Sequence, residues 1–301
     1  MEEVGTIRSL HALPPLQEIS FLESGYPLYT TGPDDSFDHL GLLAYTTLAA
    51  ERMRLIFHKR NLWRPKKEDP PGEPWLGPIL YNDHDTPVEI ILYGQGVAHD
   101  LYTSTATGEA TYAFLRPKRK ILHTIKAKES YTLYRSGLLF GLSITGIIEI
   151  EISNTLHLGL WSSQDHVVPQ TWPTATSPWL HKPFCERWGA VRLDLTQTPY
   201  AYQIGTEKDD VFGQRYQILW YLQNPFEQTV LASLHLVSKE REFASPVVAE
   251  QLQMPPRPLR PLEDAWLIDQ IILAPQQKHV IPTRLMASPS CYLHWSFKFI
   301  D

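Results

Sequence analysis

The stretch Trp75-Leu-Gly-Pro-Ile-Leu-Tyr-Asn82-Asp-His-Asp-Thr-Pro-Val-Glu-Ile-Ile-Leu-Tyr93-Gly94 has the pattern of a strand, a polar turn and a second strand. It is apolar up to Tyr81, and from Val88 it is mostly apolar and partly β-branched again, as strands are. The four residues from Asn82 to Asp85 favour turns. This stretch therefore predicts a β-hairpin.

A second copy of this design lies in the other half of the chain, from Tyr216 to Val237. There, a strand rich in aromatic residues ends on Asn224, a short polar turn follows, and an apolar strand returns. A later pair of segments, 121–133 and 269–281, also shares a pattern of strand, short polar turn and strand. The correspondence predicts two all-β units with a similar order of parts.

We therefore predict an all-β protein of two tandem antiparallel β-sandwich domains, Ig-like or jelly-roll-like. A length of 301 residues agrees with about two domains. The prolines between residues 162 and 183 mark the boundary. The predicted parts are an extended lead-in (1–20), a first sandwich (21–161), a Pro/Trp-rich linker (162–184) and a second sandwich (185–301).

Composition narrows the class of protein. Charged residues make up 20% and apolar residues 43% of the chain, which is typical of a globular protein. The net charge of -6 and the pI of about 6.1 argue against a nucleic-acid partner, which usually leaves a basic footprint. No window has the roughly 18 apolar residues of a transmembrane helix. The first residues, Met1-Glu-Glu-Val-Gly-Thr, have neither the basic nor the apolar region of a signal peptide.

Two segments have features of both a strand and a helix. Residues 52–58 alternate in the manner of a strand, although residues 48–54 are good helix formers, and we favour the strand. Residues 112–115 fit either a strand or a short helix.

The two cysteines, Cys185 and Cys291, are either separate buried thiols, which we favour, or a disulfide that stabilises the second domain by about 4–5 kcal/mol.

Several segments resemble a family of uncharacterised bacterial envelope proteins. Met53-Arg-Leu-Ile-Phe-His58-Lys-Arg-Asn61 is similar to its Arg-Leu-x-aromatic-His-x-x-Asn segment. The hairpin at 82–88 and the segments 94–102, 271–275 and 283–292 also resemble it, so that the likeness covers residues 20–300. The family contains secreted Gram-positive proteins, sometimes adjacent to a copper-amine-oxidase-like N-terminal domain, and similar cyanobacterial proteins of unknown function. The resemblance implies an extracytoplasmic or cell-surface location and no particular chemistry.

One predicted turn contains residue types that can bind a metal ion. Asp83, His84 and Asp85 are weak metal-ligand candidates, because they place carboxylate and imidazole donors in one turn. A metal site needs three or four converging groups, whereas Asp and Asn serve turn geometry by themselves. We therefore favour a turn and predict no metal or other cofactor.

Catalytic patterns are also absent from the sequence. There is no Gly-x-Ser-x-Gly motif around a nucleophile. Glu149 and Glu151 are two residues apart on a predicted strand and share one face, whereas glycosidases hold two carboxylates across a cleft. We favour a solvated strand face and predict that the protein is not an enzyme.

Two groups of residues are candidates for binding. Arg116, Lys118, Arg119 and Lys120 form a basic run that suits an anionic surface, although a solvated loop is favoured. Trp172 and Trp179 lie in the predicted linker, where they either stack on sugar rings or pack between the two domains, which we favour.

These observations predict a non-catalytic structural or binding module of a bacterial cell surface or extracellular assembly. It is expected to act through a protein partner or through self-assembly of edge strands. The alternative is a carbohydrate-binding module or glycan-active enzyme with a surface glycan as its partner. That alternative depends on the two linker tryptophans and on the pair Glu149 and Glu151.

Overall fold

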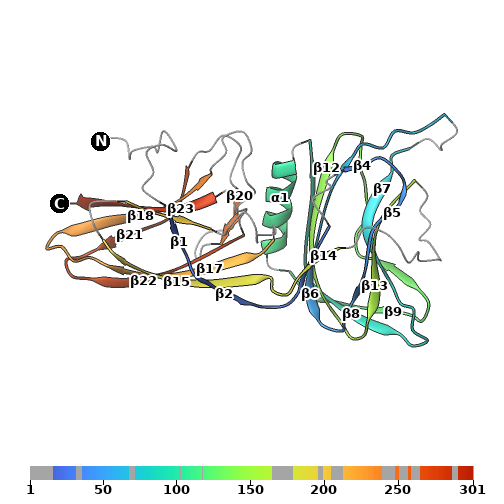
Figure 1. The fold of residues 1–301 in the computed structure, drawn as a ribbon, viewed down its shortest axis with the longest axis horizontal. Helices are drawn as coiled ribbons and strands as arrows, with labels where there is room; N and C mark the ends of the chain where they lie inside the picture. The colour runs from blue at the N-terminus through green and yellow to red at the C-terminus, as the bar shows by residue number, and fades with distance from the viewer. Residues whose placement is uncertain are drawn as a thin grey trace. The chain divides into compact units, whose positions relative to one another are not determined.

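The structure is a computed structural model, and its described residues form strands and one helix (Figure 1). It describes residues 16–31, 36–67, 72–101, 103–116, 118–164, 179–195, 199–204, 213–238, 248–250, 257–258, 265–286 and 291–300. Strand makes up 64% of the described structure. The chain divides into two compact units. Unit 2 is Tyr26–Pro183, and unit 1 combines Met1–Gly25 with Phe184–Asp301.

Unit 2 contains two sheets. Sheet C has the order β14-β3-β6-β12-β8-β9, and β4 pairs with β6. Sheet D has the order β10-β7-β13-β5, and β11 pairs with β7. In chain order the strands are β3 (Leu28–Thr30), β4 (Ser36–Phe37), β5 (Gly41–Leu48), β6 (Arg52–Asn61), β7 (Trp75–Tyr81), β8 (Val88–Asp100), β9 (Ile121–Ile125), β10 (Ser130–Thr132), β11 (Ser136–Gly137), β12 (Ser143–Ile152), β13 (Leu156–Ser163) and β14 (Leu180–Lys182).

The core of unit 2 lies between these sheets. Apolar residues that alternate along each strand point inward from both of them, as in Ile144, Ile148 and Ile150 of β12. The predicted strand at 52–58 is confirmed as part of β6, which contributes Met53, Leu55 and Phe57 to this core. Tertiary burial of this alternating face outweighs the helix propensity of the preceding residues.

The single helix, α1 (Thr103–Leu115), packs on β8 and β12 of sheet C (Figure 1). Two glycines of β8 let it approach closely. A Cβ on Gly96 would lie 2.0 Å from the carbonyl oxygen of Ala110, and one on Gly94 would lie 3.2 Å from the ring of Phe114. The helix was not predicted over this length, because four of its thirteen residues are threonines, which are weak helix formers.

Unit 1 also contains two sheets. Sheet A has the order β1-β16-β23-β18-β21, and sheet B has the order β2-β15-β17-β22-β19-β20. One core cluster is formed by residues of both, including Trp220 of β17 and Trp295 of β23. The strands are β1 (Leu16–Glu18), β2 (Phe21–Ser24), β15 (Glu186–Asp194), β16 (Tyr200–Gln203), β17 (Arg215–Gln223), β18 (Thr229–Ser238), β19 (Val248–Glu250), β20 (Arg257–Pro258), β21 (Ala265–Leu273), β22 (Lys278–Met286) and β23 (Cys291–Ile300).

The two units repeat a pairing scheme. Strands β1-β16-β23-β18-β21 of sheet A correspond to β3-β6-β12-β8-β9 of sheet C. In both sheets the first pair is parallel and the other three are antiparallel. The other two sheets, D and B, differ in one corresponding pair of strands. In sheet D, β13 runs antiparallel to β7, whereas in sheet B, β15 runs parallel to β17.

The prediction of two tandem antiparallel β-sandwich domains is wrong. Strands β1 and β2 precede unit 2 in the chain but pair with β16 and β15 of unit 1, so the units do not follow one another in tandem. Sheets A, B and C are mixed, because β1 pairs with β16, β15 with β17, and β3 and β4 with β6, in parallel. The chain instead passes repeatedly from one sheet to the other, in a β-solenoid-like winding of about five turns.

The physical reason for this error lies in what a hydrophobic pattern reports. Alternation shows which side chains of a strand face the core, but it does not show which strand is the neighbour or in which direction that neighbour runs. The units divide at two places: at Gly25–Tyr26, after the predicted lead-in, and at Pro183–Phe184, inside the segment predicted as a linker.

Two further expectations concern the two cysteines and the absence of a membrane-spanning helix. Cys185 is fully buried, and the side chain of Cys291 lies outside the described residues, so their pairing stays a prediction. Within the described part of the chain, no helix is long and apolar enough to cross a bilayer.

Candidate functional site

The turn between β7 and β8 is held by the buried side chain of Asn82. Its Nδ2 donates to the carbonyl oxygens of Thr86 at 2.8 Å, Lys126 at 3.1 Å and Ile125 at 3.2 Å. Its Oδ1 accepts a hydrogen bond from the backbone N–H of His84 at 3.0 Å. One amide thus fixes the turn and ties it to the end of β9.

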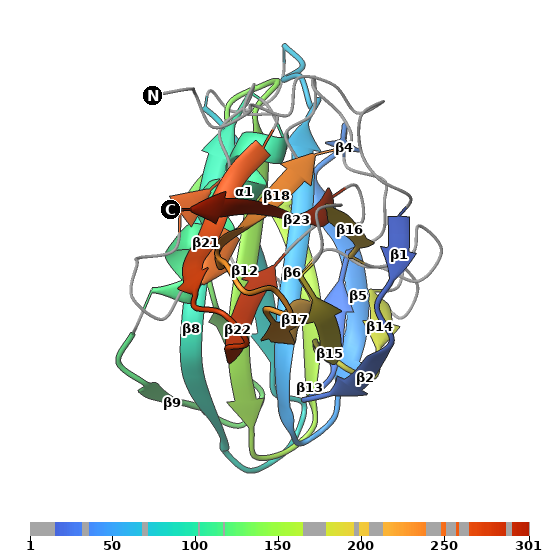
Figure 2. The same ribbon diagram turned by 90° about the vertical axis from the view of Figure 1, so that its left-hand side faces the viewer.

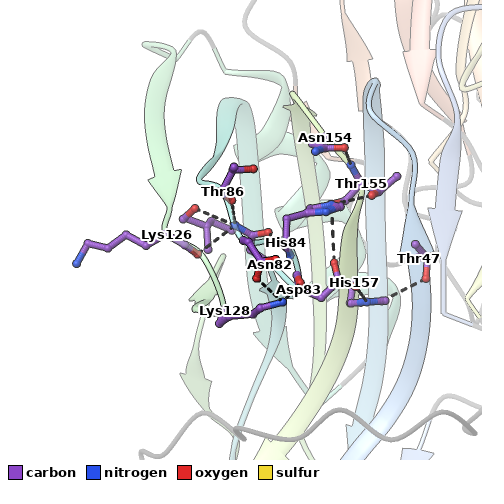
Figure 3. A network of polar contacts seen from close by, with 12 residues as sticks. Thr47, Asn82, Asp83, His84, Thr86, Lys126, Lys128, Asn154, Thr155 and His157 are labelled. Carbon is purple, nitrogen blue, oxygen red and sulfur yellow. Dashed lines mark hydrogen bonds and ion pairs between the residues drawn. The ribbon is translucent and has the colours of Figure 1, made fainter.

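Around this turn, side chains from three strands form a polar network (Figure 3). His157 is the second residue of β13, and in register it lies between Thr47 of β5 and Tyr81 of β7. Its Nε2 lies 3.0 Å from Oδ2 of Asp83, and its Nδ1 lies 2.6 Å from the hydroxyl of Tyr45. The rings of Tyr45 and Tyr81 both stack on the imidazole.

The hydrogen-bond partners assign the tautomer of His157. With Nε2–H donated to the carboxylate of Asp83, Nδ1 is an acceptor and the hydroxyl of Tyr45 donates to it. The hydrogen bond from His157 lowers the pKa of Asp83 below its usual value, which keeps the carboxylate charged. The three groups thus form one continuous chain of hydrogen bonds from the tyrosine to the carboxylate.

The neighbouring residues of the turn have separate partners. Nε2 of His84 donates to the carbonyl oxygen of Thr155 at 2.9 Å and lies 3.8 Å from Oδ1 of Asp83. Asp85 forms an ion pair with Lys128 at 3.1 Å, and that lysine also donates to the backbone carbonyl of Asp83. The predicted metal candidates therefore do not converge, and no group of three His, Cys, Asp or Glu residues in the described chain has a metal-binding arrangement.

A second polar cluster lies on the outward face of sheet C. Glu149 is buried, with 6% of its surface exposed, and accepts from Nε of Arg52 at 2.9 Å and from Nη2 of Arg54 at 3.3 Å. Burial raises the pKa of Glu149, but the charge of Arg54 and the hydrogen bonds from Tyr26 and Arg52 outweigh it, so this pKa lies below its usual value.

This cluster corrects the expectation of a solvated face at Glu149. Its neighbour Glu151 instead accepts a hydrogen bond from the hydroxyl of Tyr93. The guanidinium of Arg52 lies 3.9 Å from the centre of the Tyr93 ring, and the ammonium of Lys120 lies 4.5 Å from it. Both carboxylates are thus engaged by neighbouring side chains on one strand face.

The predicted basic run lies directly before β9. Arg116, Lys118, Arg119 and Lys120 are all exposed. Figure 2 shows β9 at the margin of its sheet, outside β8. In the described structure β9 pairs with β8 alone, and its side chains Ile121 and Leu122 are 46% and 60% exposed. The structure therefore places a basic run next to an apolar edge strand.

The two linker tryptophans differ in what the structure describes. Trp179 is 4% exposed and belongs to the core of unit 2, so its ring does not stack on a sugar. Trp172 lies outside the described residues. Trp179, in this core, thus does not lie with Glu149 and Glu151 on the outward face of sheet C.

Sequence reasoning missed the partners of these clusters. His157 and Tyr45 lie far from Asp83 in the chain, and only the register of β13 with β5 and β7 brings them together. For Arg52 and Arg54 a signal existed, because alternating arginines on β6 match the alternating glutamates on β12 in spacing. That signal becomes readable only when the two strands are known to be neighbours.

Comparisons with known proteins add little to this geometry. No protein-family model matches the chain, and no curated protein matches it either. Among solved structures, it is similar to the crystal structure of Lac15 from a marine microbial metagenome, with 11% identity and a TM-score of 0.17. The match covers 92% of this chain and 61% of that chain, so this chain spans less than two thirds of that protein. Such a likeness supports no conclusion about fold or function, and the resemblance to bacterial envelope proteins stays a prediction.

Proposed function

We propose that this chain is a non-catalytic binding module of a bacterial cell surface or extracellular assembly, and that it binds a protein partner by adding a strand to sheet C at β9. The family resemblance supports the location. The observation that carries the binding mode is the exposed edge of β9, with its apolar residues Ile121 and Leu122 directly after a basic run.

The backbone of β9 supplies the attraction. In an antiparallel pair, alternate residues of a strand direct their N–H and C=O groups away from the partner. Strand addition satisfies those groups with main-chain hydrogen bonds, and side chains then decide which segment is accepted. Ile121 and Leu122 favour apolar side chains in the incoming strand, since each buries apolar area there.

The basic run sets the charge of the partner. Arg116, Lys118, Arg119 and Lys120 are exposed, and nearby Lys126 and Lys128 expose 77% and 56% of their side chains. A segment with carboxylates beside its apolar residues therefore suits this edge. The proposed partner is an extended, acidic and apolar peptide segment of another protein chain.

A labelled peptide tests this proposal. It alternates valine and threonine and carries two aspartates at each end; its control has N-methyl groups on alternate amides, which removes the main-chain donors. The peptide is expected to bind the full chain more weakly as salt is added, because exposed charges are screened. Leu122→Lys on β9 should lower its affinity by at least about tenfold, or 1.4 kcal/mol.

A matched control separates the edge from general surface effects. Leu139 is 52% exposed and follows β11, away from β9 in the chain, so Leu139→Lys should leave peptide affinity unchanged. Equal binding of the N-methylated peptide, or equal affinities of the two lysine variants, would contradict strand addition at β9.

A further inference from the structure

We propose that the strand accepted at β9 is β21 of a second copy of this chain, so that sheet C of one copy continues into sheet A of another. This rests on the proposed function, because it names the partner of the same edge.

The two strands occupy equivalent positions in their units. β9 is the last strand of sheet C and pairs antiparallel with β8, and β21 is the last strand of sheet A and pairs antiparallel with β18. Within the described residues each is paired on one side. β9 and β21 therefore offer two open edges of the same kind.

Both edges expose apolar side chains. On β21, Ile272 is 59% and Leu267 is 44% exposed, which matches the exposure of Ile121 and Leu122 on β9. Proteins that remain monomeric usually protect edge strands with charged side chains or proline within the strand. Here the charges flank β9, and the exposed positions within the strand are uncharged: Ile121, Leu122 and Thr124. Each edge thus has the surface that strand pairing buries.

The charges beside the two strands favour pairing of β9 with β21 over pairing of β9 with another β9. Basic residues precede β9, and Lys126 and Lys128 follow it. β21 (Ala265–Leu273) contains one acidic residue, Asp269, and no basic residue. Antiparallel pairing of β9 with another β9 sets the basic run of one copy beside Lys126 and Lys128 of the other. The ion pairs of these lysines with Glu129 and Asp85 reduce the repulsion, but the charge of the basic run remains. Antiparallel pairing of β9 with β21 places no basic residue of β21 on this contact, and the one charge that β21 carries, on Asp269, is opposite in sign to the basic run.

A contact between two different edges has a consequence for assembly. After one β9–β21 contact, the pair of chains still has one unused β9 and one unused β21. Such head-to-tail contacts either close into a ring or continue into a filament. The full chain is therefore expected to self-associate as its concentration rises, and to dissociate in high salt as exposed charges are screened.

Two single variants and their mixture test this arrangement by sedimentation velocity. Leu122→Lys disables β9 and Ile272→Lys disables β21, and both positions are exposed, so the cores stay intact. Each variant alone should be monomeric, because every contact needs one edge of each kind. Their mixture should form a one-to-one complex and nothing larger, because one intact β9 and one intact β21 remain.

The other outcomes are distinct. If Ile272→Lys alone still self-associates while Leu122→Lys does not, the contact joins two copies of β9, and the inference is wrong. The reverse pattern joins two copies of β21 and also contradicts it. A wild-type chain that stays monomeric at every concentration, but binds the acidic peptide at β9, overturns the second-copy partner and leaves the proposed function standing. Leu139→Lys should assemble as the wild type does.

Discussion

Asn82 and Asn224 hold the same set of backbone groups in the two units. Each Nδ2 donates to three carbonyl oxygens: one lies four residues ahead in the turn, and two lie at the end of the following edge strand. For Asn82 these are the carbonyls of Thr86, Ile125 and Lys126. For Asn224 they are the carbonyls of Gln228, Leu273 and Ala274. Each Oδ1 accepts from the N–H two residues ahead. The strand, turn and strand predicted in each unit are thus present, with equivalent hydrogen bonds in the two turns. The predicted hairpin pairing is wrong, because β7 and β8 lie in different sheets, as do β17 and β18.

The hydrogen bonds that the two turns share do not depend on the polar network around His157. At the positions of Asp83 and His84, unit 1 has Pro225 and Phe226. Phe226 packs edge-to-face on Phe299, with 5.0 Å between ring centres. The turn therefore forms without the polar network around His157, so that network is an addition specific to unit 2.

The asparagines are expected to be required for stability. Asn82→Asp keeps the size of the side chain but removes the N–H donors and directs a carboxylate at three carbonyl oxygens. We expect a loss of about 2–3 kcal/mol in the free energy of unfolding, since buried polar groups lose their partners. Denaturant unfolding at neutral pH measures it. Asp85→Asn, at a position whose side chain is 92% exposed, is the control and should change stability by less than about 0.5 kcal/mol.

The close approach of α1 to sheet C depends on Gly96. Gly96→Ala places a Cβ 2.0 Å from the carbonyl oxygen of Ala110, so the helix must shift, at a cost of about 1–3 kcal/mol in unfolding free energy. In Gly137→Ala the nearest atom to the new Cβ is a side-chain oxygen of Glu73 at 3.6 Å, an ordinary contact. Thermal unfolding of both variants distinguishes them; equal melting temperatures would show that α1 does not pack on Gly96.

Glu149 is expected to matter more than Glu151. Glu149→Gln removes the charge that pairs with the Arg54 guanidinium, which is 1% exposed, and should cost about 3 kcal/mol of stability. Glu151→Gln lies two residues further on the same face and keeps an acceptor for the hydroxyl of Tyr93, so it should cost less than about 1 kcal/mol. Chemical denaturation measures both, and a larger loss for Glu151→Gln is the contrary result.

The network around His157 predicts a specific titration. The folded pKa of Asp83 is lowered, so its contribution to stability is present above the unfolded value and is lost as pH falls through the folded value. Carbon-detected NMR should find the Asp83 carboxyl titrating below its ordinary value of 3.8. His157→Phe removes the first cause of this shift, and the midpoint should rise towards that value. An unchanged midpoint would show that His157 does not hold the carboxylate.

Acid should destabilise unit 1 through a pair of histidines. His294 of β23 lies opposite His235 of β18, and burial, followed by the charge of His235, lowers the pKa of His294 to about 4. The unfolded chain binds the proton near pH 6.5, so stability falls as the pH drops from about 6.5 to about 4. The loss is about 3 kcal/mol at most from this group, at 1.36 kcal/mol per pH unit.

His294→Gln provides the test. Its unfolding free energy should depend less on pH than that of the wild type between these limits, and the two should run parallel above pH 7. Parallel curves throughout the acid range would mean that His294 does not titrate in the folded chain as described.

Local chemistry allowed the repeated turns to be predicted. The correspondence of 121–133 with 269–281 agrees with the structure down to Lys128 and Gln276, which have positive φ angles of 59° and 60°. Those turns are set by neighbouring residues, which is why the sequence contains the signal. Strand order and the helix α1 depend instead on packing between distant segments, such as Gly96 against Ala110, and no local pattern reports it.

The same distinction applies to the candidate sites. Asp83 and the basic run were found because their residues are adjacent in the chain. His157 and Tyr45 were not, since a shift of β13 by one residue would turn His157 into the core. The open edge of β9 required the sheet order, which alternation within one strand does not contain.

Amide hydrogen exchange tests the proposed strand addition most directly. It compares the full chain at low concentration with and without the acidic strand peptide, and it resolves β9 from the rest of sheet C. Strand addition at β9 predicts slower exchange in Ile121–Ile125, abolished by Leu122→Lys, with the core strands β6 and β12 unchanged. Peptide binding that leaves exchange in Ile121–Ile125 unaltered, or that slows another edge instead, would contradict it.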